Sequence, residues 1–239
     1  MVTGAGRGLG RACAIALAQA GAEVWLAART KNDIDEAASE IGAKARAVVC
    51  DVTRPEDFKK ILSGIEVLDI LVNNAGTNIP EPFVEVTEAH LDAILAINLR
   101  AAFLVAQAAA RKMLEHPQRK SRGGAIVNMS SQMGHVGAVN RSVYCMTKHG
   151  LEGLTKAMAL ELVAHNVRVV SVAPTFIETP LVKEFLQRPG FSEWVHARIP
   201  AGRLGEMEEV AAAVLFAASP AASLVTGTSL LVDGGWTAQ

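Results

Sequence analysis

The chain has 239 residues, of which 50 % are hydrophobic and 20 % charged, and its 23 basic residues nearly balance 24 acidic ones. This length predicts one α/β domain with a sizeable core. The net charge of −1 excludes the basic field that holds nucleic acid or an anionic membrane. We expect no membrane span, because no apolar run approaches the necessary length.

Cysteine usage and the start of the chain bear on its compartment. Cys13, Cys50 and Cys145 are odd in number and lack the spacing of a disulfide framework, which favours a reducing compartment. No cysteine or histidine pairs have metal-ligand spacing, so we expect no metal. The chain opens directly into a glycine loop without a secretory signal, and we therefore expect a cytoplasmic protein.

Short apolar runs rich in β-branched residues alternate with longer alanine-rich segments. The runs expected to be strands cover residues 23–28, 46–50, 69–73, 124–130, 167–173 and 229–233. The segments expected to be helices cover roughly residues 9–20, 31–41, 55–64, 87–115, 142–165 and 206–218. This alternation predicts a doubly wound parallel sheet of about seven strands, forming a single domain over residues 1–239.

Two places depart from this regular pattern. Residues 1–3 leave room for only a very short first strand, although that strand would be central in this architecture. The hydrophilic run "HPQRKSRGG" (116–124) lies between an expected helix and an expected strand. We interpret it as a solvated loop.

A glycine-rich turn follows the first strand in "VTGAGRGLGRA" (2–12). The stretch does not spell G-x-G-x-x-G; its fitting glycines are Gly4, Gly8 and Gly10. Glycines let the backbone approach a pyrophosphate, and the N-terminus of the following helix offers free N–H groups. A tight turn without a ligand is the alternative, so this loop alone is a moderate signal.

The end of the second expected strand sharpens this interpretation. An NAD site usually places an acidic residue there to bind the ribose 2′-hydroxyl. Here the sequence has Ala28 and then Arg29, with Arg7 inside the glycine loop. Arginine can hold a 2′-phosphate through paired hydrogen bonds. Two arginines and the missing acid favour NADP(H) over NAD(H), with the Thr30 hydroxyl as a further contact.

A second informative stretch is "NMSSQMGHVGAVNRSVYCMTKHG" (128–150). Tyr144, the only tyrosine of the chain, is four residues before Lys148, which places both on one face of a helix. An ammonium one turn away favours the phenolate and lowers the pKa of the tyrosine. A serine at the preceding strand end, Ser130 or Ser131, could hydrogen-bond a substrate oxygen. Such pairs also occur by chance on helices; the nucleotide loop makes chance a weaker explanation.

These landmarks together resemble the short-chain dehydrogenase/reductase family over essentially the whole chain. The segments that carry the resemblance are "TGAGRGLG" (3–10), "CDVT" (50–53), "NNAG" (73–76), "INL" (97–99), "NMSS" (128–131), "YCMTK" (144–148), "APTFIETPL" (173–181) and "TGTSLLVDGG" (226–235). Each is weak alone, and the combination is specific.

The resemblance implies a catalytic tetrad of Asn98, Ser131, Tyr144 and Lys148, in which the spacing to the tyrosine selects Ser131. It also implies a set of cofactor contacts from the loops at the strand ends. These are Gly4, Arg7, Gly8, Leu9, Gly10, Arg29, Thr30, Asp51, Val52, Asn74, Ala75, Gly76, Tyr144, Lys148, Pro174, Ile177 and Thr179.

The implied activity is hydride transfer between a nicotinamide cofactor and a secondary alcohol or ketone. Tyr144 would be the acid/base, Ser131 would polarise the substrate oxygen, Lys148 would hold the ribose, and Asn98 would hold a water that supplies protons. The chain departs from the family at Thr175, where glycine is usual. The threonine is expected to narrow the pocket near the nicotinamide or substrate.

Substrate walls are expected around the site and in a variable lid near residues 181–200. Candidate substrate contacts are Gln132, His135, Asn140, Arg141, Thr175, Phe176, Glu178, Phe185 and Trp194. The polar members suit a sugar or sugar acid, unless several simply face solvent. A 3-oxoacyl thioester reductase is the main alternative, and an idle NADP-binding scaffold is a minor one. The family's helical interfaces imply a homotetramer, or a dimer.

Overall fold

The computed structural model describes residues 1–179, 182 and 190–239. Its centre is one sheet of seven parallel strands in the order β3-β2-β1-β4-β5-β6-β7, which confirms the predicted doubly wound architecture. The strands are β1 (Val2–Thr3), β2 (Val24–Ala28), β3 (Ala45–Val49), β4 (Ile70–Asn73), β5 (Gly124–Met129), β6 (Val167–Pro174) and β7 (Ser229–Val232).

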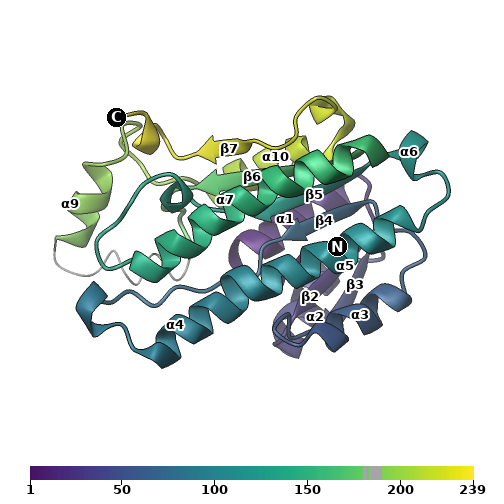
Figure 1. Cartoon of the computed structure of the whole chain (residues 1–239), viewed down its shortest axis with the longest axis horizontal. Coiled ribbons are helices and arrows are strands. Elements are labelled where there is room, and N and C mark those ends of the chain that lie inside the picture. Colours follow the sequence, from purple (N-terminus) through teal and green to yellow (C-terminus); the bar gives the residue numbers. More distant parts are fainter. Residues whose placement is uncertain (180–181, 183–189) are drawn as a thin grey trace.

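Helices cover both faces of this sheet. Those of the described residues are α1 (Gly8–Gln19), α2 (Lys31–Ile41), α3 (Pro55–Ser63), α4 (Glu88–Leu95), α5 (Ala102–Leu114), α6 (Arg119–Arg122), α7 (Ser142–Leu162), α9 (Phe191–His196) and α10 (Met207–Ala218). One core contains α1, α2 and α10, and the other contains α3, α5 and α7. Figure 1 shows α5 and α7 in front of the sheet and α1 and α10 behind it.

The buried strands explain why their sequences are apolar throughout. Val170 and Val172 of β6 pack on the side of α1 and α10, while Val167 and Val169 pack on the side of α5 and α7. Side chains alternate between the two faces of a strand, and here both faces are covered. All the paired strands are parallel, so their carboxyl ends gather at one edge. A ligand site is expected along that edge.

The short first strand is paired on both sides. Val2 aligns with Leu26 of β2 and with Val72 of β4. The ladder continues into Met1, whose carbonyl oxygen accepts a hydrogen bond from the N–H of Val72 at 2.9 Å.

The helix expected over residues 87–115 is continuous but changes character in its middle. A π-helical segment, η2 (Ala96–Ala101), separates α4 from α5. By length and mean hydropathy, 1.7, residues Glu88–Leu114 could span a membrane, so the expectation that no segment qualifies was wrong. In the fold, α5 is a core helix whose Val105, Ala106 and Ala109 pack under the sheet.

The hydrophilic run at residues 116–124 is not simply a solvated loop. It contains the short helix α6, and Arg119 within it is only 3 % exposed. The guanidinium pairs with Asp69 at 3.1 Å and donates to the carbonyl oxygens of Met113 and Leu68 at 2.8 and 2.7 Å. A buried guanidinium with these partners ties the run to β4 and α5, which corrects the sequence interpretation at this residue.

Candidate active site

The loop between β1 and α1 forms a cradle that requires glycine. Gly4 and Gly8 have φ angles of 65° and 55°. A Cβ atom on Gly10 would lie 2.2 Å from the carbonyl oxygen of Gly4, so α1 could not begin this close to the loop with any other residue. Arg7, at the N-cap of α1, makes no side-chain cap hydrogen bond. The first N–H groups of α1 therefore remain available to an anion.

The segment after β4 locks this cradle to the sheet. The N–H groups of Asn74 and Ala75 both donate to the Thr3 hydroxyl, at 3.0 and 3.1 Å. The Asn74 side-chain amide also donates to the carbonyl oxygen of Thr3 at 2.9 Å. Leu9, which lies between the cradle glycines, packs against the core behind it. The backbone path of the loop is thus held before any ligand binds.

The residues after β3 lie next in line along the same edge. Asp51 accepts hydrogen bonds from the Thr53 hydroxyl at 2.7 Å and from its N–H at 3.0 Å. These bonds, followed by the charge of Arg29, lower the pKa of Asp51, although burial opposes them. Asp51 is therefore ionised at neutral pH, and Val52 beside it is half-buried.

The two arginines that predict a 2′-phosphate site are both accessible to solvent. Arg7 and Arg29 are both exposed, at the ends of the neighbouring strands β1 and β2. Among the described residues, neither forms an ion pair with a carboxylate. Thr30, the N-cap of α2, is exposed and makes no side-chain cap hydrogen bond. Two guanidiniums and a hydroxyl thus remain available at this end of the cradle.

Three of the four expected catalytic residues meet where β5 ends and α7 begins. Ser131 lies just beyond β5, and Tyr144 and Lys148 lie on the first turns of α7. The Lys148 ammonium is 5.4 Å from the centre of the Tyr144 ring and donates to the carbonyl oxygen of Met129 at 2.7 Å. The Ser131 side chain adjoins the Tyr144 hydroxyl and lowers the pKa of that group. The structure therefore brings serine, tyrosine and lysine into one cluster.

Burial shifts the pKa values of this cluster. Burial lowers the pKa of Lys148 to about 8, and the charge of Glu152 opposes that shift. Burial also raises the pKa of Tyr144, while the hydrogen bond from Ser131 lowers it. The net shift of the Tyr144 pKa is upward, opposite to the direction expected from the neighbouring ammonium. Loss of hydration outweighs the stabilisation of the phenolate.

Asn98 lies in the π-helical segment η2 and joins it to α7. Its side-chain amide donates to the Thr77 carbonyl oxygen at 2.8 Å and to the Thr147 hydroxyl at 3.2 Å, and its Oδ1 accepts from the Thr77 N–H at 2.8 Å. A Cβ atom on Gly76 would lie 3.3 Å from Asn98 Oδ1 and 3.9 Å from Lys148 Nζ. Gly76 therefore lies beside both the Asn98 side chain and the Lys148 ammonium.

The loop after β6 forms another wall at the same edge of the sheet. Pro174 is the last residue of β6, and Ile177 is buried and forms an isolated β-bridge with Gly205. The N–H of Thr179 donates to the Ile177 carbonyl oxygen at 2.7 Å, and its hydroxyl accepts from the N–H of Val182 at 3.3 Å.

Of three expected substrate residues, two adjoin the reacting groups and one contacts β7. Gln132 is buried, and its side-chain oxygen accepts a 2.7 Å hydrogen bond from Ser131. The His135 ring is directed at Ser229 of β7, with Nε2 3.0 Å from the hydroxyl oxygen. Arg141 is half-buried and lowers the pKa of Tyr144. Gln132 and Arg141 therefore adjoin the reacting groups, whereas the His135 ring contacts β7.

The other substrate candidates lie after β6. Phe176 packs edge-on against Trp194 of α9, with ring centres 6.2 Å apart, and also against Trp236 near the chain end. Glu178 is exposed, with its N–H bonded to the Gly205 carbonyl oxygen at 2.8 Å. Phe185 and the rest of residues 181 and 183–189 of the lid expected at residues 181–200 lie outside the described residues, so that expectation stays a prediction.

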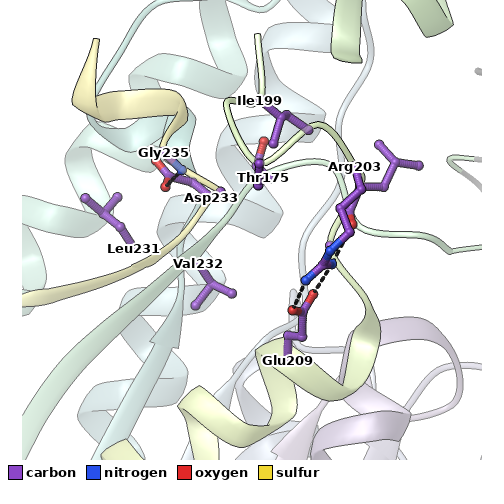
Figure 2. A pocket seen from close by; sticks show the side chains of 12 residues that line it. Thr175, Ile199, Arg203, Glu209, Leu231, Val232, Asp233 and Gly235 are labelled. Atoms are coloured by element: carbon purple, nitrogen blue, oxygen red, sulfur yellow. Dashed lines mark hydrogen bonds and ion pairs between the residues drawn. The ribbon is translucent and has the colours of Figure 1, made fainter. Parts of the chain in front are cut away.

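Thr175 lines a separate pocket of about 280 Å³. Figure 2 shows it with Ile199 and Arg203 on one side and Leu231–Gly235 on the other. The Thr175 hydroxyl is buried, and none of the described residues hydrogen-bonds it. No member of the tetrad lines this pocket. The unusual threonine therefore forms the wall of a cavity outside the catalytic cluster.

Three residues that organise the site were not expected from the sequence. Thr3 holds the segment after β4, and Thr147 holds Asn98. Glu152 is buried one helical turn beyond Lys148. The spacing of Glu152 from Lys148 was visible in the sequence, but only the fold reveals that its carboxylate is buried.

Comparison with known proteins defines the class. The family model described as "Enoyl-(Acyl carrier protein) reductase" matches residues 4–237. L-xylulose reductase of Mesocricetus auratus is 41 % identical over 236 residues, covering 99 % of this chain and 95 % of that protein. The chain belongs to the short-chain dehydrogenase/reductase family.

Two solved structures extend this comparison. A protein from Agrobacterium tumefaciens, provisionally described as a 2-deoxy-D-gluconate 3-dehydrogenase and solved with bound NADP, is 38 % identical with a TM-score of 0.90, covering 100 % of this chain and 95 % of that one. The 3-ketoacyl-(acyl-carrier-protein) reductase of Brucella melitensis, complexed with NADH, is 34 % identical with a TM-score of 0.91, covering 98 % and 96 %. The expected class, an oxidoreductase acting on alcohol or carbonyl groups, is thereby confirmed.

Proposed function

We propose that this chain interconverts a secondary alcohol and a ketone with NADP(H), and that its substrate is a small polar molecule such as a sugar or sugar acid. The observation that carries the proposal is the cluster of Ser131, Tyr144 and Lys148 beside a glycine cradle. The similarity to L-xylulose reductase and to the NADP-bound structure supports the same conclusion.

The residues at the cradle fit such a cofactor. Gly4 and Gly10 let the loop, α1 and Asn74 approach one another closely, Gly8 has no protein atom within 4 Å of where its Cβ atom would lie, and the start of α1 offers N–H groups to the pyrophosphate. Arg7 and Arg29 would hold the 2′-phosphate, with Thr30 beside them. Along the same edge, Asp51 and Val52 would bracket the adenine, Asn74–Gly76 would line the ribose path, and Pro174, Ile177 and Thr179 would contact the nicotinamide.

When bound, the nicotinamide ring supplies or accepts the hydride at the substrate carbon. Tyr144 gives its proton to the carbonyl oxygen during reduction and takes it back during oxidation. Ser131, which adjoins Tyr144, positions and polarises that oxygen. The Lys148 ammonium holds the ribose and stabilises the phenolate while the proton is absent.

Asn98 would hold a water molecule that supplies protons to Lys148. Its side-chain amide is engaged by Thr77 and Thr147, so a water would be held by the backbone carbonyl oxygen of Asn98 in the widened π-helical turn. Such a water would link Lys148 to solvent and return the proton that Tyr144 gives up.

The substrate panel is the decisive experiment. We expect turnover of pentuloses, hexonates or their oxidised forms, in preference to 3-oxoacyl thioesters, with NADP(H) preferred over NAD(H). The buried Gln132 amide and the nearby Arg141 support a hydroxylated or acidic substrate. The similarity to a 3-ketoacyl reductase favours the alternative, a 3-oxoacyl thioester reductase. Higher kcat/KM on acyl thioesters than on every sugar would replace our proposal with that one.

We also propose a tetramer with two-fold symmetry in the cytoplasm. Apolar side chains lie exposed along α5 and on and just beyond α7: Phe103 (47 %), Leu114 (39 %), Met146 (49 %), Leu160 (81 %) and Val163 (51 %). Leu231 of the edge strand β7 is 46 % exposed. Covering such faces stabilises an oligomer. Analytical ultracentrifugation should give the mass of four chains; two chains would indicate a dimer that uses one of these faces.

A further inference from the structure

A buried carboxylate lies behind the catalytic cluster and has no role in the mechanism above. Glu152 belongs to α7, four residues after Lys148, and its side chain is 8 % exposed. A charge in such surroundings is costly unless it is paired and hydrogen-bonded. The Glu152 carboxylate therefore needs groups that stabilise it, and its charge could in turn stabilise another group.

Residues from three other elements hold this carboxylate. The Ser171 hydroxyl of β6 donates to Glu152 Oε2 at 2.7 Å, and the Ser229 hydroxyl of β7 donates to Oε1 at 3.4 Å. Nε2 of His135, which follows η3 (Gln132–Gly134), lies 3.5 Å from Oε1. A Cβ atom on Gly134 would lie 3.2 Å from Glu152 Cγ, so η3 packs directly on this side chain.

Few titratable side chains surround Lys148 and Glu152 in the described part of the chain. Of the described residues that face Lys148 or Glu152, the titratable ones are Tyr144 on α7 and His135 after η3. The strand β5 contributes only the Met129 carbonyl oxygen, while β6 and β7 contribute the serine hydroxyls described above.

We propose that Glu152 is a positioning residue for the reaction: its fixed carboxylate is the counter-charge that keeps the buried Lys148 protonated at the pH where the enzyme works. The proposal rests on the proposed role of Lys148 in holding the cofactor ribose. Glu152 and Lys148 share one face of α7, where residues four apart are neighbours. The charge of Glu152 opposes the loss of the Lys148 proton that burial favours.

The consequence is a specific pH dependence of cofactor binding. Wild-type affinity for NADPH should be level between about pH 7, where the 2′-phosphate is ionised, and the pKa of Lys148, about 8, and should fall above it as the ammonium is lost. Removing the charge while keeping the shape, in Glu152→Gln, should move this break downward by about one pH unit. A shift of at least this size is typical of one opposite charge on a neighbouring side chain.

The control variants separate charge from shape. Glu152→Asp keeps the carboxylate and should leave the break within about half a unit of wild type. Glu152→Met is neutral and of similar length, so it should give the same shift as Glu152→Gln even if one of them folds poorly. Glu161→Gln makes the identical change at an exposed position of α7 and should move nothing.

A double-mutant cycle tests the coupling without cofactor or turnover. Glu152→Gln should reduce the folding equilibrium constant about tenfold more in the wild-type background than in Lys148→Met, as measured by urea unfolding at neutral pH. A NADPH break that stays in place in both neutral variants, or a cycle with no coupling, would overturn the proposal. If the cycle shows coupling but the protein does not bind NADPH at all, the proposed cofactor is refuted and the interaction between Glu152 and Lys148 stands.

Discussion

The ionisation of Tyr144 can be measured directly because the chain contains a single tyrosine. Any phenolate absorbance that develops on titration with base comes from this residue. Burial raises the pKa of Tyr144 above its usual value of 10, and the hydrogen bond from Ser131 is the largest opposing influence. The perturbation we consider is therefore Ser131→Ala, which removes that hydrogen bond and leaves the ring in place.

The structure sets the size of the effect. A hydrogen bond to an ionised group contributes about 1.5–3 kcal/mol, which corresponds to about one to two pKa units. Ser131 has one hydrogen to donate, and it is directed at Gln132 Oε1, 2.7 Å away. Stabilising the phenolate requires giving up that bond, so the net gain lies at the low end. We expect Ser131→Ala to raise the pKa of Tyr144 by about one unit.

The assay is an ultraviolet difference titration of the protein, with circular dichroism recorded in parallel to mark the onset of alkaline unfolding. Tyr144→Phe serves as the blank. Gln132→Leu provides a matched control of opposite sign, because it frees the Ser131 hydrogen for the phenolate and should lower the midpoint. A wild-type midpoint at or below 10, or a Ser131→Ala midpoint that is unchanged or lower, would refute the reasoning.

Three further predictions concern turnover, cofactor choice and the cradle. Tyr144→Phe should abolish turnover yet keep the Kd for NADPH within a few-fold, as measured by fluorescence titration; turnover within about tenfold of wild type would exclude it as the acid/base. Arg7→Ala and Arg29→Ala should each reduce the ratio of kcat/KM for NADPH to that for NADH by about tenfold or more. Each arginine can make charge-assisted hydrogen bonds to the 2′-phosphate of about 1.5–3 kcal/mol, and solvent screening reduces this contribution. Equal losses with both cofactors would contradict the phosphate clamp. Gly10→Ala should abolish NADPH binding in a calorimetric titration, since its Cβ atom would lie 2.2 Å from a backbone oxygen; binding near wild-type affinity would show that the loop can move.

Local patterning determined the layered architecture of this protein. The strands are recognisable because burial on both faces demands apolar residues throughout, and β6 follows this rule from Val167 to Val172 except at Arg168 and Ser171. Gly4, Gly8 and Gly10 are equally recognisable, since the loop leaves no room for a side chain at Gly4 and Gly10 and holds Gly8 at a positive φ angle. Tyr144 and Lys148 share a face through helical periodicity alone, which needs no tertiary information.

Only the tertiary structure decided which polar groups are buried and with what partners. Arg119 stands in a run that is hydrophilic by composition, but Asp69, 50 residues away, draws it into the interior. Glu152 acquires Ser171 and Ser229 from two strands that follow it in the chain. The direction of the Tyr144 pKa shift depends on burial, which periodicity does not report. Pairing and loss of hydration arise from contacts between distant segments, and so they appear only when the chain is folded.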